Sequence, residues 1–333
     1  MKEIVLVIGI QGAGKSTIVT SYTLNGYARF NRDELGGNLE SLNRKVEAAI
    51  NDGTSKIVMD NTYGTKEQRA EVINLAKKHG FQVKCVWLKT SIEDAQFNVS
   101  KRIFSMADFA IDRERELPTH IAYGKMNPPN LLGPDGNKHI NGVGHVPAIA
   151  LFAYKKKFEK PTKDEGFYAV EEIEFKRVMD KNRYDTKALL LDYDGTLRDT
   201  ISGEKFPTKP NDIKILPNRK ETLARYQSQG YMLLGVSNQS GVGRGVFTHD
   251  EAVACFEKTN ELLGFDIDYQ FCPHNKFPVN CFCRKPAPGL GVYFIEKYGL
   301  SPKDCIFVGD KKSDQTFAAR CGFRYLPAEL FFK

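Results

Sequence analysis

Apolar runs alternate with amphipathic stretches along this chain of 333 residues. Short apolar segments bounded by turn residues predict buried strands, and longer segments with one apolar face predict helices. In the first half the predicted strands are 3–9, 56–60, 82–88 and 169–178. One helix is predicted to begin at Lys15, and three more are predicted at 65–80, about 91–105 and 146–161. A strand–helix alternation of this kind predicts an α/β fold built on a parallel sheet.

The same alternation restarts after a polar break at 179–187, which we interpret as a domain boundary. The predicted strands of the second half are 188–194, 231–237, 267–271 and 304–310, with helices between them. The sequence therefore predicts two α/β domains, 1–180 and 186–333. The segment 118–147, rich in Pro, Gly and Asn, interrupts the first series. We expect a long loop there, which acts as a lid or contacts nucleic acid, or else is a solvated insertion.

Composition changes this picture little. The net charge of +7 is mild, so it tolerates a polyanionic ligand without requiring one. No apolar run approaches the roughly 18 residues that span a membrane, and the apolar start of the chain is too short for a signal peptide. We therefore expect a cytoplasmic protein (or a nuclear one in a eukaryote) with no membrane partner. Seven cysteines without a secretory signal argue against a disulfide framework.

The stretch GIQGAGKS at 9–16 follows a predicted strand and precedes a predicted helix. It fits the pattern G-x-x-x-x-G-K-S, in which glycines let backbone N–H groups wrap phosphates at a helix N-terminus. The lysine then reaches the β- and γ-phosphates of ATP, and the serine hydroxyl binds Mg²⁺. A glycine-rich turn of no chemical use is the alternative, but both the motif and its context favour ATP. The expected nucleotide contacts are Gly9, Gly12, Gly14, Lys15, Ser16 and Thr17.

Carboxylates near this loop are candidates for activating the group that receives the phosphate. Asp33, in RFNRDEL, is placed to take a proton from an acceptor hydroxyl. The alternative for Asp33 is a solvated helix cap. Asp60 and Asn61 end the strand at 56–60 and face the same crevice, so we expect them to bind substrate.

Three stretches resemble the kinase domain of polynucleotide 5′-kinase/3′-phosphatases: FNRDELG, VMDNTYGTKEQR and YKKKFEKPTKDEGFYAVEEIEF. The resemblance implies that Asp33 is the general base for a 5′-OH and that an arginine closes over the phosphates. Arg102 is the candidate, with Arg113 in reserve; the alternative for Arg102 is a surface charge. The phage member of this family has an arginine three residues past the base, where this chain has Gly36. Acceptor binding must then use another residue, for which we propose Arg32.

A second phosphate site is predicted around DYDGT. Asp192 and Asp194 lie two apart at the end of a strand, so alternation points both side chains the same way. DYDGT followed by LRDT resembles the haloacid-dehalogenase phosphatases. The resemblance implies that Asp192 attacks phosphorus to form an aspartyl-phosphate. It also implies that Asp194 protonates the leaving oxygen and then activates water.

The other elements of that family's site follow in order at later strand ends. SNQ at 237–239 offers Ser237 and Asn238 to phosphoryl oxygens, and Lys285 in CRKP supplies positive charge. Asp310, in GDKKSD, is expected to complete a Mg²⁺ site with Asp192 and the Asp194 carbonyl, with Asp314 behind it. The metal would offset repulsion between the nucleophile and the phosphate.

The loop FCPHNKFPVNCFCRKP holds Cys272, His274, Cys281 and Cys283. C-x-H…C-x-C predicts a tetrahedral, structural zinc site; the alternative is four ordinary residues. The loop, SNQSGVGRG and CRKPAPG resemble histidinol-phosphate and heptose-bisphosphate phosphatases. Zinc would stiffen a loop that delivers Arg284 and Lys285 to the phosphate.

The sequence thus predicts a P-loop kinase sheet followed by a Rossmann-like haloacid-dehalogenase domain. Little chain is available for a cap, so we expect an open site that admits a bulky substrate. Adding and removing phosphate on one small molecule would waste ATP, whereas at the two ends of a broken strand it prepares DNA or RNA for a ligase. The rival interpretation is a metabolic enzyme that joins a small-molecule kinase to a sugar- or histidinol-phosphate phosphatase. A non-enzymatic scaffold is disfavoured because no core catalytic residue is missing.

Overall fold

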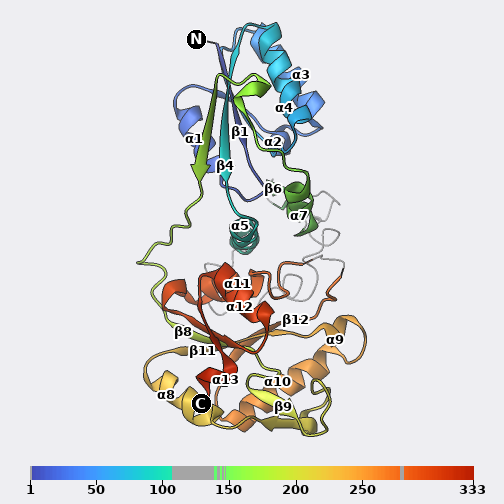
Figure 1. The fold of residues 1–333 in the computed structure, drawn as a ribbon, viewed down its shortest axis with the longest axis vertical. Helices are drawn as coiled ribbons and strands as arrows, with labels where there is room; N and C mark the ends of the chain where they lie inside the picture. Colours follow the sequence, from blue (N-terminus) through green and yellow to red (C-terminus); the bar gives the residue numbers. More distant parts are fainter. Residues whose placement is uncertain (1, 107–138, 141–142, 145, 147, 278–280) are drawn as a thin grey trace. The chain divides into compact units, whose positions relative to one another are not determined.

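The computed structural model describes residues 2–106, 139–140, 143–144, 146, 148–277 and 281–333 (Figure 1). The chain divides into two compact units, and the junction between them falls at Arg177 and Val178, close to the predicted end of the first domain at residue 180. The division differs from the prediction in one respect, because the described end of helix α5, from Ser100 onward, groups with the second unit. Most of the segment 118–147, like Arg113, lies outside the described residues.

The first unit contains the predicted parallel sheet, with the strand order β2-β3-β1-β4-β7. Strand β1 is central in this order, and all six of its residues are buried, as expected for a strand covered on both faces. The strands are β1 (Glu3–Ile8), β2 (Ala28–Phe30), β3 (Lys56–Asp60), β4 (Gln82–Lys89) and β7 (Ala169–Glu174).

Helices cover this sheet. Alternate β1 residues, including Leu6, pack against apolar side chains of α3 and α4. Asn38 caps α3 and Thr65 caps α4, which explains where these two helices begin. The helices are α1 (Lys15–Leu24), α2 (Arg32–Leu35), α3 (Leu39–Asn51), α4 (Lys66–Lys78), α5 (Ile92–Met106), α7 (Ala148–Lys157) and the 3₁₀ turn η2 (Lys163–Glu165), with a small hairpin of β5 (His139–Ile140) and β6 (Val143–Gly144).

The second unit has its own parallel sheet, in the order β12-β11-β8-β13-β14. Strand β8 is central and fully buried. The strands are β8 (Ala188–Leu191), β11 (Met232–Asn238), β12 (Asp268–Cys272), β13 (Ile306–Gly309) and β14 (Arg324–Pro327), with a separate antiparallel hairpin of β9 (Arg198–Thr200) and β10 (Ile213–Ile215).

Helices lie on both faces of this second sheet (Figure 1). Leu189 and Leu191 pack on the side of α8, α10 and α13, while Phe307 meets Phe317 of α12 on the other side. Between Asp194 and α8 the chain forms only the hairpin and one 3₁₀ turn, which agrees with the expected lack of a large cap. The helices are η3 (Pro210–Asp212), α8 (Arg219–Ser228), α9 (Ser240–Gly243), α10 (His249–Leu263), α11 (Gly289–Tyr298), η4 (Pro302–Asp304), α12 (Lys312–Cys321) and α13 (Ala328–Phe331).

The strand–helix alternation and the two parallel sheets confirm the predicted fold class. Among the described residues, we find no helix with the length and apolarity that crossing a bilayer requires.

Candidate active sites of the two units

The phosphate-binding loop of the first unit lies between β1 and α1, at the carboxyl edge of the sheet. Gly12 and Gly14 have positive φ values of 79° and 90°, which glycine adopts without strain. Lys15 starts α1 and its Nζ donates to the carbonyls of Gly9 at 2.8 Å and Ile10 at 3.0 Å. The ammonium therefore lies across the loop, beside the N-terminus of α1, where Ser16 and Thr17 form the first turn. A helix N-terminus with a lysine beside it is suited to hold phosphates.

Helix α5 and the residues just before it contact the loop. Asn98 Nδ2 donates to the Gly12 carbonyl at 2.8 Å, and Thr90 Oγ1 donates to the Ala13 carbonyl at 3.0 Å. A Cβ placed on Gly12 would come within 2.8 Å of the Ala95 carbonyl oxygen, so α5 packs directly on the loop. Arg102 lies four residues after Asn98, one helical turn further along α5. Its predicted role over the phosphates stays a prediction, as does the alternative role for Arg113.

Asp60 ends β3 beside the loop strand, because it is paired in register with Val7 of β1. Its carboxylate is buried and accepts two hydrogen bonds from Arg29, at 3.1 Å from Nε and 2.9 Å from Nη2. Its carbonyl accepts one from Asn31 Nδ2 at 2.6 Å. The hydrogen bonds to Asp60 and the charges of Asp60 and Glu34 raise the pKa of Arg29, although the burial of Arg29 acts in the opposite direction. Asp60 is thus an anchor for Arg29, and direct contact of Asp60 with a substrate stays a prediction.

Asn31 links this anchor to the candidate base. Its Oδ1 accepts from the backbone N–H of Asp33 at 2.8 Å and of Glu34 at 3.2 Å, so Asn31 is the cap of α2. The alternative interpretation of Asp33 as the helix cap is therefore wrong. The signal for Asn31 was present in the sequence, since asparagine before a charged first turn is a common helix start.

The Asp33 carboxylate is 63% exposed and lies 3.6 Å from Nη2 of Arg32, so it can reach a substrate in solvent. Asn61 is buried; its Oδ1 accepts from the Arg32 backbone N–H at 3.1 Å and its Nδ2 donates to the Tyr63 hydroxyl at 3.2 Å. Asn61 thus fixes the start of α2, whereas Asp33 and Arg32 are accessible. This arrangement can present a base and a cation to an incoming acceptor.

The second unit brings Asp192 and Lys285 together, as the sequence predicted. Asp192 follows β8 and is only 4% exposed. Lys285 Nζ lies 2.9 Å from Asp192 Oδ1 and 2.8 Å from Asp314 Oδ1, and donates to the Val236 carbonyl at 2.8 Å. Burial alone would lower the pKa of Lys285, but the Asp192 and Asp314 charges outweigh it, and the pKa is raised. Lys285 therefore places its positive charge against the carboxylate that is predicted to attack phosphorus.

Asp194 is held at both carboxylate oxygens by residues that were not singled out in the sequence. Arg198 Nε donates to Oδ1 at 2.8 Å and Gln239 Nε2 donates to Oδ2 at 2.8 Å. Arg198 is 1% exposed, and its Nη1 also donates to the Cys255 carbonyl and the Thr259 hydroxyl. Gln239 lies in the quoted SNQ stretch and Arg198 in the quoted LRDT stretch, but neither was assigned a role toward Asp194.

Two of the groups predicted to bind magnesium, the carboxylates of Asp192 and Asp310, lie together at this edge of the sheet with the carboxylate of Asp314. Carboxylate oxygens of Asp192, Asp310 and Asp314 lie within 4.8 Å of one another. Gly195 has φ +84°, and a Cβ there would lie 2.6 Å from Asp310 Oδ2, so the glycine makes room for that carboxylate. Burial raises the pKa of Asp310. Hard carboxylate and carbonyl oxygens are the donors that Mg²⁺ prefers, and the set fits this ion.

The remaining predicted phosphate ligands lie around Lys285. Ser237 is buried, and its Oγ accepts from Gln239 Nε2 at 3.0 Å. Asn238 Nδ2 donates to the Lys285 carbonyl at 3.0 Å, and Asn238 Oδ1 accepts from the Lys285 backbone N–H at 2.9 Å. Its contacts position Lys285, so substrate binding by Asn238 itself stays a prediction. Arg284 is partly buried and its Nη1 donates to the His274 carbonyl at 3.2 Å.

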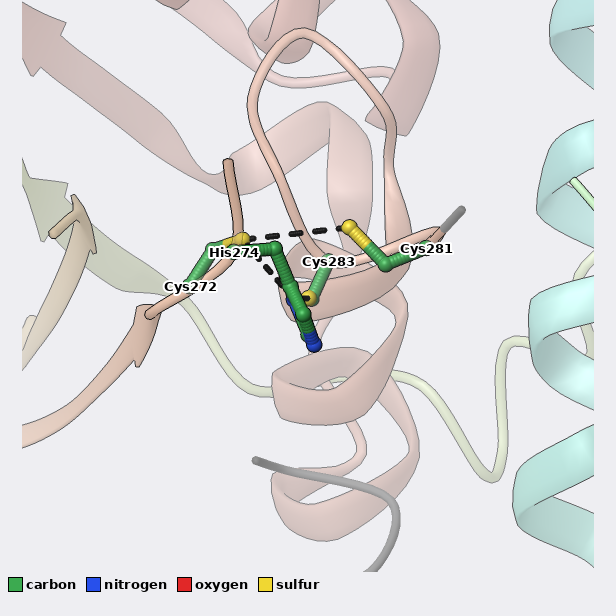
Figure 2. Close-up of side chains that lie close together, drawn as sticks. All are labelled: Cys272, His274, Cys281 and Cys283. Carbon is green, nitrogen blue, oxygen red and sulfur yellow. Dashed lines mark hydrogen bonds between the residues drawn. The ribbon is translucent and has the colours of Figure 1, made fainter. Parts of the chain in front are cut away.

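The four predicted zinc ligands converge (Figure 2). His274 Nδ1 lies 3.3 Å from Cys272 Sγ and 3.1 Å from Cys283 Sγ, and Cys272 Sγ lies 3.8 Å from Cys281 Sγ. Zn–S bonds of about 2.3 Å in a tetrahedron require sulfurs about 3.8 Å apart. Hydrogen bonds from the Cys272 and Cys283 thiols lower the pKa of Cys281, while burial raises theirs. The donor set therefore fits a tetrahedral zinc ion.

Comparisons with known proteins match two parts of the chain to different families. Residues 4–115 match the AAA domain family and residues 187–332 match the polynucleotide kinase 3 phosphatase family. The probable D-glycero-D-manno-heptose-1,7-bisphosphate 7-phosphatase of Thermoplasma volcanium is 36% identical over 139 residues, covering 40% of this chain and 92% of that protein. The histidine biosynthesis bifunctional protein HisB of Legionella pneumophila is 31% identical over 148 residues, covering 42% of this chain and 41% of that protein.

A solved structure of the Pnkp1/Rnl/Hen1 RNA repair complex aligns with 98% of this chain and 95% of its own chain, at 15% identity. Its TM-score is 0.32, which is too low to support an argument about function. Together the family matches and the two sites describe an enzyme with a kinase domain and a phosphatase domain.

Proposed function

We propose, from the premise that this chain belongs to the polynucleotide kinase/3′-phosphatase family, that it heals broken nucleic-acid strands by phosphorylating 5′-OH ends and removing 3′-phosphates. The observation that carries the proposal is the presence of two separate phosphate sites of opposite chemistry in one chain. One is the loop around Lys15, and the other is the carboxylate cluster around Asp192 and Lys285. Opposite reactions are productive together only when they act on different groups of the substrate.

In the proposed kinase step, the loop with Lys15, Ser16 and Thr17 holds the phosphates of ATP. Asp33 accepts the proton of the 5′-hydroxyl as that oxygen attacks the γ-phosphorus, and ADP leaves. The exposure of Asp33 supports this role, because the acceptor is a strand end that must enter from solvent. Arg32 would contact the acceptor, and Arg102 would neutralise charge on the transferred group. Asp60 and Asn61 support this geometry by holding Arg29 and the start of α2.

In the proposed phosphatase step, an oxygen of Asp192 attacks the 3′-phosphate and forms an aspartyl-phosphate while the ribose or deoxyribose oxygen leaves. Asp194 gives that oxygen a proton and then takes one from the water that hydrolyses the intermediate. Lys285 and Ser237 bind phosphoryl oxygens. Bound magnesium would supply positive charge between nucleophile and phosphate; the Asp192 and Asp310 carboxylates and the Asp194 carbonyl would hold it.

Zinc at the four-residue cluster would act structurally, because all four positions are filled by the protein. The loop that carries the cluster continues directly into Arg284 and Lys285, so a stiff loop would fix the cation at Asp192. We propose DNA or RNA strand ends as the substrates. A ligase is the partner expected to consume the 5′-phosphate and 3′-hydroxyl products. We expect these reactions to take place in the cytoplasm, or in the nucleus of a eukaryote.

A metabolic enzyme remains the second candidate, and one observation favours it. The two relatives described above are named as a heptose-bisphosphate phosphatase and a histidine-biosynthesis protein, and both names point to small-molecule metabolism. The same nucleophile and cation would serve either substrate, so the cluster itself does not separate the two candidates. The presence of a P-loop kinase unit in the same chain favours a nucleic-acid strand end as the substrate.

The proposal is tested with an oligonucleotide that carries a 5′-OH and a 3′-phosphate. We expect Asp33→Asn to abolish phosphate gain at the 5′ end alone, and Asp192→Asn to abolish phosphate loss at the 3′ end alone. Matched controls are Glu40→Gln and Asp199→Asn, which change exposed carboxylates of the same units. Loss of both reactions in either Asp variant, with the controls active, would contradict two independent sites.

A further inference from the structure

A second lysine reaches the proposed magnesium site. Lys311 Nζ lies 3.2 Å from the Asp194 carbonyl oxygen, 3.2 Å from Asp310 Oδ1 and 3.9 Å from Asp192 Oδ2. These atoms belong to the three residues that the magnesium site requires. A magnesium ion at this site would use the same set of oxygens as the Lys311 ammonium.

The two lysines at this edge of the sheet differ in their freedom to move. Lys285 is 2% exposed at its side chain and is fixed by two carboxylates and a carbonyl. The Lys311 side chain is 53% exposed, and among the described residues its Nζ contacts oxygens of Asp192, Asp194 and Asp310. A flexible four-carbon chain with one face in solvent can withdraw its ammonium at little cost.

Magnesium binds oxygens at about 2.1 Å, so an ion held by these groups would lie in the space that the Lys311 ammonium now fills. Two cations so close would also repel each other. We propose that Lys311 is a tethered cation that competes with Mg²⁺ for the oxygens of Asp192, Asp194 and Asp310, and so sets the affinity of the phosphatase unit for its metal. The inference rests on the magnesium site of the proposed function.

We expect Lys311 to stabilise the protein when no divalent ion is bound. It neutralises part of the charge of Asp192 and Asp310, which would otherwise face each other at close range. Removing it is expected to destabilise the chain when no divalent ion is present and to have less effect when the ion replaces its charge. A residue that merely covers the surface would not link stability to metal in this way.

The test is a titration of the full chain with Mn²⁺ as the probe, with free Mn²⁺ measured by electron paramagnetic resonance. The buffer is cleared of divalent ions by resin without a chelator, and Mn²⁺ is too weak a competitor to displace zinc from thiolates. The variants are Lys311→Met and, should that protein fail to fold, Lys311→Gln. The control is Lys312→Met, since Lys312 Nζ donates to Gln315 Oε1 at 2.6 Å instead.

We expect the Kd for Mn²⁺ to fall about tenfold in Lys311→Met, because a unit charge about 4 Å away in a half-exposed site changes affinity on that scale. Lys312→Met should match the wild type. The melting temperature without metal should be lower in Lys311→Met than in the control, and the gap should close as Mn²⁺ is added. Equal or weaker Mn²⁺ binding in Lys311→Met would overturn the proposal.

A separate variant distinguishes failure of this inference from failure of the proposed function. Asp310→Asn should abolish the Mn²⁺ site. If it binds Mn²⁺ as tightly as the wild type does, the magnesium site of the proposed phosphatase is itself refuted, and the role of Lys311 is refuted with it. If Asp310→Asn loses the site while Lys311→Met leaves affinity unchanged, the site stands and only the inference fails.

Discussion

Gly195 offers a sharp test of the carboxylate site, because an added methyl group would meet a proposed metal ligand. The backbone at Gly195 has φ +84°, and a Cβ there would lie 2.6 Å from Asp310 Oδ2. Gly203 has the same φ of +84°, with nothing within 4 Å of its would-be Cβ. Gly195→Ala and Gly203→Ala therefore share the backbone strain and differ in the clash.

The magnitudes follow from these values. A non-glycine residue in the left-handed region costs about 1–2 kcal/mol, so both variants should lose about that much stability. In Gly195→Ala the Asp310 carboxylate must also withdraw by about 0.8 Å to reach ordinary contact. Metal ligands tolerate displacements of only about 0.2 Å. Since the carboxylate is the free end of a side chain, the clash should cost metal affinity more than folding energy.

The assay is 3′-phosphate release as a function of Mg²⁺ concentration, with 5′ phosphorylation by the same preparation as an internal reference. We expect Gly195→Ala to need at least tenfold more Mg²⁺ for half-maximal release, while Gly203→Ala keeps the wild-type requirement. Kinase activity should be unchanged in both. Identical Mg²⁺ profiles for the two alanine variants would refute the claim that Gly195 makes room for a metal ligand.

The phosphate-binding loop, the buried lysine and the zinc cluster each give a further prediction. Gly12→Ala should abolish the kinase reaction, because its Cβ would meet the Ala95 carbonyl oxygen at 2.8 Å, whereas Gly26→Ala, at a similar φ with nothing within 4 Å, should retain it. Lys285→Met should destabilise the chain by about 3–5 kcal/mol in urea unfolding, since it leaves buried carboxylates unpaired. The pKa of Lys285 is raised, so its stabilisation should be fully present below the unfolded-state pKa of about 10.4 and be lost as the pH rises through the higher folded-state value, which unfolding measured between neutral and high pH would detect. Removal of zinc by a thiol-reactive reagent should release metal, detected by a colorimetric dye, and reduce 3′-phosphate release before 5′ phosphorylation.

Local patterns predicted most of this fold. The buried strands at 3–9 and 188–194 read as apolar runs because both faces of a central parallel strand are covered, and the structure gives β1 and β8 there. The prediction missed the helix α3, the strands β2 and β14, which lie at sheet edges, and the short hairpin of β9 and β10. Edge and hairpin strands of three or four residues carry too few apolar positions to show a period.

The resemblance to haloacid-dehalogenase phosphatases also indicated residues that lie together in the structure, such as Asp192 and Lys285. Arg198 lies in the quoted LRDT stretch, but its burial was not foreseen because two of its partners, Cys255 and Thr259, come from α10, more than fifty residues away. Substrate binding by Asn238 stays a prediction, and the structure adds that its amide fixes the Lys285 backbone. A motif predicts which residue types form a site. The hydrogen-bond partners of each side-chain amide, however, depend on residues that the fold brings close from other parts of the chain.

The central claim is that one chain changes both ends of a nucleic-acid strand. The most direct measurement is mass spectrometry of an oligonucleotide with a 5′-OH and a 3′-phosphate, incubated with Mg²⁺ and ATP labelled with heavy oxygen at the γ-phosphate. Fragment ions then report each end separately. We predict labelled phosphate at the 5′ end and a free hydroxyl at the 3′ end of the same molecule. An unchanged oligonucleotide, beside rapid release of phosphate from a heptose bisphosphate or histidinol phosphate, would contradict the account.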